Sequence, residues 1–168
     1  MSKHTLVVNL FGGSCIGKST LMAKIFAELK TKGYDCEMAT EFIKDMIWED
    51  NTNATQDEIY TFANQNHKLR NLQGKVNIII TDSPILLTSA YSNNVNLQKL
   101  AISEFKKYNN LNFLLKRETK FVENGRVDDL NHAIHIDKTI KKIMQNNDIN
   151  YITTSVNDLD YIISKIIN

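Results

Sequence analysis

Proline, cysteine and net charge are all scarce in this sequence, and each scarcity excludes a class of protein. One proline, Pro84, interrupts 168 residues, and no stretch rich in proline, glycine or serine marks a boundary, so we expect one domain over residues 1–168. The two cysteines, Cys15 and Cys36, suggest neither a disulfide framework nor a metal site. A formal net charge of +1 lacks the basic excess of proteins that bind duplex DNA non-specifically, although a neutral protein can still have a basic groove.

The apolar run near the amino terminus, in MSKHTLVVNLF, is also short. It cannot span a bilayer and has no small-residue cleavage site, so we interpret it as a buried strand and expect no membrane partner. Free thiols fit a reducing compartment, which makes the cytoplasm the expected location. With 42% apolar and 23% charged residues, the composition is that of a globular protein with one substantial core.

The chain does contain a regular alternation of short apolar runs and helical patterns. The runs predicted to be strands cover residues 5–10, 35–40, 76–81, 111–115 and 149–153. The helical patterns cover 18–32, 43–47, 55–74, 97–108, 129–145 and 159–166. A capping box, Thr55-x-x-Glu58, opens the third of these helices. Strands separated by helices require parallel crossovers, so the predicted fold is α/β, with a five-stranded parallel sheet covered by helices on both faces.

The segment GGSCIGKST lies between the first predicted strand and the first predicted helix. It contains the phosphate-loop pattern G-x-x-x-x-G-K-[ST] of P-loop NTPases, in the required strand-to-helix context. Glycines let several backbone N–H groups point at one anion, and the helix start adds its positive end. We expect this loop to bind ATP, with Lys18 between the β and γ phosphates and the Ser19 hydroxyl on Mg²⁺. The alternative is a glycine-rich turn without a ligand. The loop residues are Gly12, Gly13, Ser14, Cys15, Ile16, Gly17, Lys18, Ser19 and Thr20.

Two acidic residues end the neighbouring predicted strands. Asp82 follows the third strand in NIIITDSP, and Glu41 follows the second in MATE. Ligands of parallel sheets bind at the carboxyl ends of the strands, so both carboxylates should lie beside the phosphate loop. We expect Asp82 to hold Mg²⁺ directly or through water, and Glu41 to orient or deprotonate an acceptor hydroxyl. The alternatives are a cap near Pro84 for Asp82 and an ordinary first-turn glutamate for Glu41.

Amide and basic side chains complete the predicted site. In the third predicted helix, Gln65 is expected to read a base edge and Arg70 to hold a phosphate, with a solvated helix face as the alternative. The loop 116–128 is polar and basic, and we expect it to act as a lid. Its Arg117 and Arg126 are candidates to close over the transferring phosphoryl group, unless the loop is only solvated.

Taken together, these motifs resemble the thymidylate-kinase-like P-loop kinases and, more narrowly, the phage-encoded 5-hydroxymethyluracil DNA kinases. The resemblance covers most of the chain. It rests on VVNLFGG…GKST, ATEFIKDMIWE, FANQNHKL, GKVNIIITDSPILL, the lid-like NGR and the acidic helix that follows. It implies ATP-dependent phosphorylation of a hydroxymethyl group on a pyrimidine already in DNA. That step leads toward bulkier thymine modifications, which protect phage DNA from host nucleases, and it implies the cytoplasm of a host bacterium as the location.

Three functions stay open on the sequence. The resemblance favours hydroxymethyluracil-containing DNA as the acceptor, whereas the near-neutral charge favours a free nucleoside or nucleoside monophosphate, such as a pyrimidine nucleotide. A nucleotide-dependent ATPase or switch that works through a partner is the third. The oligomeric state is open as well, a homodimer included.

The interior of the loop, Ser14-Cys15-Ile16, departs from the resembled family. Relatives commonly have small residues and glycine there. Because a β-branched residue does not easily take a positive φ, we expect Ile16 to give the phosphate cradle a different shape.

Overall fold

Five parallel strands form the centre of the computed structural model, which describes residues 4–118 and 129–168. They are β1 (Leu6–Phe11), β2 (Cys36–Ala39), β3 (Ile78–Thr81), β4 (Asn109–Leu115) and β5 (Ile152–Thr154). Their spatial order is β2-β3-β1-β4-β5, and every pairing is parallel. The predicted fold class is therefore confirmed, and the observed strands overlap the five predicted runs.

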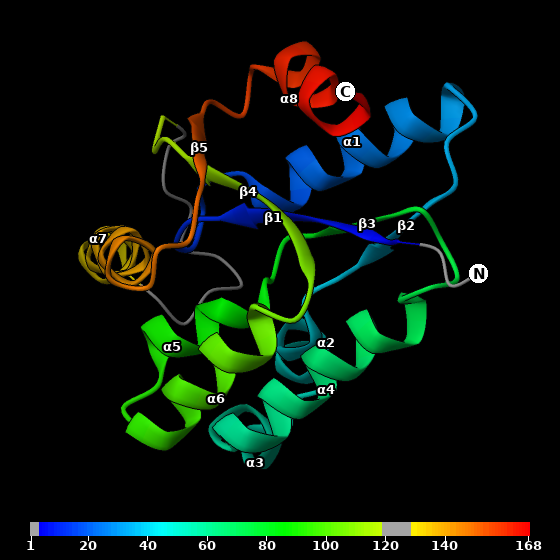
Figure 1. Cartoon of the computed structure of the whole chain (residues 1–168). Coiled ribbons are helices and arrows are strands. Elements are labelled where there is room, and N and C mark those ends of the chain that lie inside the picture. Colours follow the sequence, from blue (N-terminus) through cyan, green and yellow to red (C-terminus); the bar gives the residue numbers. More distant parts are fainter. Residues whose placement is uncertain (1–3, 119–128) are drawn as a thin grey trace.

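Helices cover both faces of this sheet, which gives three layers (Figure 1). The longer helices are α1 (Lys18–Thr31), α4 (Glu58–Leu72), α6 (Val95–Phe105), α7 (Leu130–Asn146) and α8 (Leu159–Ile167). One core contains side chains of α1 and α8 together with Val8 and Ile80, and the other contains side chains of α4, α6 and α7 together with Val7 and Ile79. Successive strand residues point to opposite faces, so burial on both faces explains the unbroken apolar runs Val7–Val8 in β1, Ile78–Ile80 in β3 and Phe113–Leu115 in β4. None of the described helices is long and apolar enough to cross a membrane.

The chain between β2 and β3 differs from the prediction at one helix start. It forms α2 (Phe42–Trp48), α3 (Thr52–Gln56) and α4. The predicted capping box of Thr55 and Glu58 is wrong, because the Asp57 Oδ1 caps α4 by accepting the Tyr60 N–H at 2.9 Å. Thr55 lies inside α3, and its hydroxyl donates to a carbonyl of its own turn. An aspartate is a strong N-cap, and Asp57 lies between the five-residue α3 and α4, so α4 begins after it.

The segment after β3, to which the sequence assigned no element, is helical. Pro84 precedes a short 3₁₀ helix, η1 (Ile85–Leu87), which runs directly into α5 (Thr88–Tyr91). All three side chains of η1 are buried in the core that also contains α4 and α6. This apolar anchor fixes Leu87 and Tyr91 beside the phosphate loop.

The strand register brings the ends of β1, β2 and β3 to one edge of the sheet. Thr81 of β3 pairs with Asn9 of β1 and with Ala39 of β2. Shortly beyond these paired residues, β1 continues into the phosphate loop, β2 into Glu41 and β3 into Asp82. The carboxyl edge of the sheet is therefore where the predicted site is built.

Candidate active site

The phosphate loop, residues 12–17, turns through three residues with positive φ. These are Gly12 at 149°, Cys15 at 58° and Gly17 at 95°. The expected conflict at Ile16 does not arise, since Ile16 is not among the positive-φ residues and its side chain is buried against Gly12. The strained residue of the loop is Cys15, because a left-handed conformation costs a residue with a Cβ roughly 1–2 kcal/mol.

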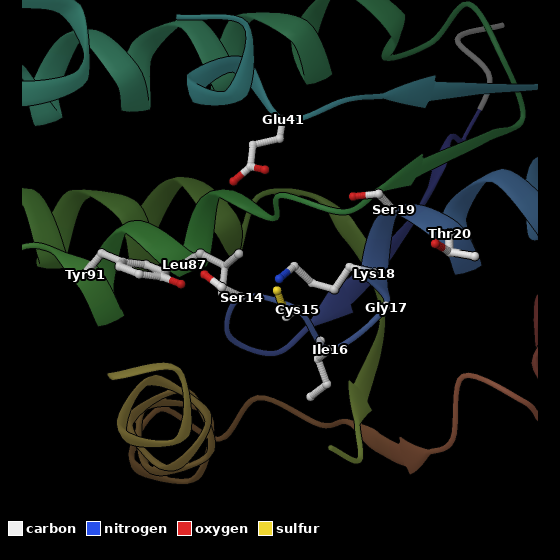
Figure 2. A pocket seen from close by; sticks show the side chains of 10 residues that line it. All are labelled: Ser14, Cys15, Ile16, Gly17, Lys18, Ser19, Thr20, Glu41, Leu87 and Tyr91. Atoms are coloured by element: carbon white, nitrogen blue, oxygen red, sulfur yellow. The ribbon is translucent and has the colours of Figure 1, made fainter. Parts of the chain in front are cut away.

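The Lys18 ammonium lies over this loop at the start of α1. Its Nζ donates to the carbonyl oxygens of Gly12 at 2.7 Å and Gly13 at 2.9 Å. Backbone amides, the positive end of a 14-residue helix and an ammonium group thus gather at one place (Figure 2). Such an arrangement binds anions, so the residues present fit the phosphates of a nucleotide.

Two adjoining cavities open at this edge of the sheet. The smaller, about 90 Å³, is lined by residues 14–20 together with Glu41, Leu87 and Tyr91. The larger, about 510 Å³, is lined from α2, α3, α4, η1 and α5. Ser14, Glu41, Leu87 and Tyr91 line both, so the two spaces meet at the phosphate loop.

Asp82 is buried and incompletely paired; it lines neither cavity itself but directly precedes Ser83, which lines the larger one. It is 4% exposed, and its Oδ1 has no hydrogen-bond partner among the described residues. Thr81 anchors the strand end, since its Oγ1 donates to the Ala39 carbonyl at 2.8 Å and accepts the Ser83 N–H at 3.1 Å. An unpaired buried oxygen costs about 1–3 kcal/mol, whereas Mg²⁺ prefers oxygen ligands of this kind. The position therefore fits the predicted Mg²⁺ site, which Asp82 would share with the Ser19 hydroxyl.

That site would need ligands from outside the protein. In the part of the chain that the structure describes, no three histidine, cysteine or acidic side chains form a group that could hold a metal ion. Mg²⁺ usually keeps several waters and takes further ligands from bound phosphates, so a sparse protein shell is compatible with a Mg²⁺ ion.

Glu41 lies at the N-cap position of α2, immediately after β2. Its backbone is extended and its side chain makes no capping hydrogen bond, but a carboxylate at the N-terminus of α2 interacts favourably with the helix dipole, so the alternative of an ordinary helix-terminal glutamate stays open. Figure 2 shows its carboxylate directed from the end of β2 toward the phosphate loop. Because Glu41 lines both cavities, a group in the larger one and a phosphate in the smaller one would both reach its neighbourhood.

Gln65 lies on the buried side of α4 and faces the larger cavity. Its Oε1 accepts the Phe42 N–H at 2.8 Å, which fixes the orientation of the amide, because only the oxygen can accept. The Nε2 is buried and finds no partner within the described ranges. An oriented donor without a protein acceptor is suited to a carbonyl oxygen of a ligand.

Arg117 follows β4 and packs onto the phosphate loop. Its Nε donates to the Asp137 Oδ2 at 2.7 Å, and its Nη1 donates to the Ser14 carbonyl at 2.8 Å. Its Nη2 is buried without an acceptor among the residues described. The structure thus places the first predicted lid cation at the loop, whereas Arg126 lies outside the described residues.

Arg70 does not belong to this site. Its Nη2 pairs with the Glu104 carboxylate of α6 at 2.8 Å, and hydrogen bonds to Glu104 and Tyr108 raise the pKa of the guanidinium above its ordinary value. The predicted phosphate-binding role is corrected for a geometric reason. Arg70 is five residues beyond Gln65, about 7.5 Å along the helix axis, and α4 leads away from the carboxyl edge of the sheet toward the start of β3.

Several residues at the site had no signal in the sequence. Lys44 and Glu58 line the larger cavity from α2 and α4, and Asp137 reaches the phosphate loop from α7. Each looks like an ordinary charged residue of an amphipathic helix. Leu87 had a weak signal, since the apolar stretch ILL follows Pro84 and predicts burial near the strand end, whereas Tyr91 had none.

Comparison with solved structures identifies the same fold in the protein NadR and in two kinases. NadR in complex with NR superposes with a TM-score of 0.68 at 11% identity, over 97% of this chain and 51% of that chain. A thymidylate kinase from Ehrlichia chaffeensis gives 0.60 at 13% identity, over 98% and 97% of the two chains. A deoxyadenosine kinase from M. mycoides gives 0.55 at 17% identity, over 96% and 97%. The chain spans about half the length of the NadR chains that it matches.

Comparison of sequences adds one family. No curated protein sequence matches the chain significantly. A family model described as an AAA domain matches residues 7–160, which include the phosphate loop, Glu41, Gln65, Asp82 and Arg117. Since this match covers most of the chain, the protein belongs to that AAA domain family of P-loop proteins.

Proposed function

We propose that this protein is an ATP-dependent kinase that phosphorylates a hydroxyl group of an acceptor bound in the larger cavity. One observation above all supports this: the phosphate loop opens directly onto a cavity of about 510 Å³, and Glu41 lines both spaces. An ATPase that activates water needs no second cavity of that size. We also propose that residues 1–168 act as one kinase domain.

The phosphoryl donor is proposed to be ATP, bound at residues 12–20. Loop amides and the Lys18 ammonium would hold its phosphates, and Arg117 would add a second cation at the transferring group. Mg²⁺, held by Asp82 and the Ser19 hydroxyl, would neutralise charge on the phosphate oxygens. The structure of NadR with NAD and AMP-PNP supports nucleotide binding in this fold.

Glu41 is the proposed acceptor of the proton. In the transfer, the acceptor oxygen bonds to the γ-phosphorus, and the bond from that phosphorus to the β–γ bridging oxygen breaks, which releases ADP. The hydroxyl proton passes to the Glu41 carboxylate. A carboxylate can accept the proton late in the transfer, when bonding to phosphorus has made the acceptor oxygen strongly acidic.

The proposed acceptor is the hydroxymethyl group of 5-hydroxymethyl-deoxyuridine in DNA, and a free pyrimidine nucleoside is the second candidate. Both bring an uncharged base and a hydroxyl into the cavity. The carboxylates of Glu41 and Glu58 line it, with Lys44 as the cation among the described lining residues, so a phosphate dianion would meet net negative charge. A base extruded from DNA leaves its phosphates outside. This charge disfavours a nucleoside monophosphate as the acceptor.

The solved structures of this fold do not decide between the candidates, since they include a thymidylate kinase as well as a deoxyadenosine kinase. NadR binds NR, and the deoxyadenosine kinase structure contains dCMP and dCDP. An acceptor cavity of this fold can therefore hold a base with its sugar. The hydroxymethyluracil in DNA is favoured by the motif resemblance of the chain.

An acceptor panel with γ-labelled ATP and Mg²⁺ tests the proposal. The acceptors are hydroxymethyl-deoxyuridine, its 5′-monophosphate, thymidylate, and single-stranded and duplex DNA containing hydroxymethyluracil. Thymine DNA of the same sequence, which lacks the acceptor hydroxyl, is the matched control. We expect label on the modified DNA alone. Label on the free nucleoside would select the second candidate, and label only in free phosphate would contradict the kinase and favour an ATPase.

Gln65→Glu tests whether the unpaired amide reads the acceptor. The change keeps the oxygen that accepts the Phe42 N–H and replaces the Nε2 donor with a second oxygen. A base carbonyl would then face an acceptor, so we expect kcat/KM for the acceptor to fall about 10- to 100-fold, while KM for ATP is unchanged. Gln73→Glu, an exposed site at the far end of α4, controls for the added charge. Equal losses in both variants would remove Gln65 from the site.

A further inference from the structure

The phosphate loop is held by α7 as well as by its own strand and helix. The Gly13 N–H donates to the Asp137 Oδ1 at 2.6 Å. A Cβ on Gly13 would lie 2.5 Å from the Ala133 carbonyl oxygen, so the loop backbone and α7 are in direct contact. Ala133 and Asp137 are four residues apart and share one face of the helix. The second glycine of the loop is therefore required by α7.

Asp137 also holds Arg117, and together they form a closed ring with the loop. The two carboxylate oxygens accept different donors, the Gly13 N–H and the Arg117 Nε, and Nη1 returns to the carbonyl of Ser14, the residue after Gly13. The ion pair is mostly shielded from water, with side-chain exposures of 15% for Arg117 and 22% for Asp137. With two of its nitrogens engaged, the planar guanidinium has one orientation, which also fixes the direction of its buried, unpaired Nη2.

We infer that Asp137 is a positioning residue for phosphoryl transfer: it orients Arg117 so that Nη2 is presented to the terminal phosphate of the bound triphosphate. The inference rests on the proposed kinase function and deepens it. Asp137 itself touches neither ATP nor the acceptor. It connects the end of β4 and the middle of α7 to two adjacent residues of the phosphate loop. In this arrangement the terminal phosphate accepts the hydrogen bond of Nη2, for which the described residues supply no acceptor.

Asp137→Asn is the direct test, because the variant keeps the shape of the side chain. A single amide oxygen cannot accept from both the Gly13 N–H and the Arg117 Nε with the strength of a carboxylate, and its NH₂ faces a donor. We expect kcat to fall about 10- to 100-fold through misplacement of the guanidinium, with KM for the acceptor within about twofold. In the Arg117→Ala background the same change should cost nothing further. A loss that multiplies with that of Arg117→Ala would overturn the inference, since it would mean that Asp137 acts by another route.

Nucleotide binding gives a readout that does not depend on turnover. If Nη2 contacts the terminal phosphate, calorimetry with Mg²⁺ should show that Asp137→Asn weakens AMP-PNP about tenfold more than ADP. Equal weakening of both nucleotides would indicate a purely structural role and would overturn the inference. Lys138→Gln, an exposed change on the same helix, is the control and should bind both as the unaltered protein does. If Asp137→Asn does not fold, Arg117→Lys keeps the pairing charge but lacks Nη2, and it should show the same selective loss.

These two measurements separate the inference from the proposed function. A protein that phosphorylates no acceptor in the panel but binds AMP-PNP more tightly than ADP, and loses that preference in Asp137→Asn, would disprove the kinase while supporting the role of Asp137. If an acceptor is phosphorylated but Asp137→Asn keeps the preference for AMP-PNP over ADP, the kinase is supported and the role of Asp137 is disproved.

Discussion

Lys18→Ala is expected to remove most of the phosphotransferase activity and to leave the fold intact. In the structure the ammonium interacts with the carbonyls of Gly12 and Gly13, at the mouth of the loop, while its neighbours Leu21 and Ile25 form the core face of α1. A charge that stabilises the transferring phosphoryl group is worth about 100- to 1,000-fold in kcat. Its loss from the surface of the loop removes no apolar packing.

Turnover with the best acceptor and a circular dichroism melt together check this prediction. Lys24→Ala, an exposed lysine of the same helix, is the matched control and should behave as the unaltered protein in both measurements. Gross unfolding of Lys18→Ala would contradict the claim that Lys18 faces a ligand. Full turnover in a folded Lys18→Ala would contradict the assignment of the phosphate loop itself.

Asp82→Asn is expected to abolish Mg²⁺-dependent turnover without loss of stability. Asparagine has the same shape, but it has no charge with which to hold the metal ion, so we expect at least a 100-fold drop in kcat. The melting temperature without metal should be equal or higher, because the buried carboxylate has an oxygen with no partner among the described residues. Function and stability therefore oppose each other at this residue.

Thermal shift with ADP separates these effects. Mg²⁺ should raise the melting temperature of the ADP complex of the unaltered protein and should add little to that of Asp82→Asn. Asp160→Asn, in the first turn of α8 and outside both cavities, is the control for removing one carboxylate. Unchanged turnover in Asp82→Asn, or an equal Mg²⁺ shift in all three proteins, would remove Asp82 from the metal site.

The phosphate loop and the acidic strand ends could be predicted because their positions follow from local rules. A strand, a glycine-rich turn and a helix start are contiguous in the chain, so spacing alone placed Lys18 and Ser19. Asp82 and Glu41 required one further rule, that parallel strands present their carboxyl ends at a common edge. Their chemical roles stay predictions, although the unpaired oxygen of Asp82 supports its role.

The wrong predictions concern the direction in which the third predicted helix runs. Gln65 and Arg70 are five residues apart in this helix, and both were predicted to lie at the site. The helix axis takes Arg70 to Glu104 at the other end of α4, while Gln65 remains at the larger cavity. The predicted N-terminus of this helix at Thr55 was wrong because Asp57 caps the free N–H groups at the break between α3 and α4.

By itself, the sequence determined that this protein has an α/β fold, a phosphate loop between the first strand and the first helix, and carboxylates after the second and third strands. Those features depend on residues close together in the chain. Only the tertiary structure decided that Asp137, 124 residues from Gly13, holds the loop and Arg117 together, and that α2, α4 and α5 enclose a second cavity. Such contacts depend on how helices pack across the sheet, which no local pattern of residues encodes.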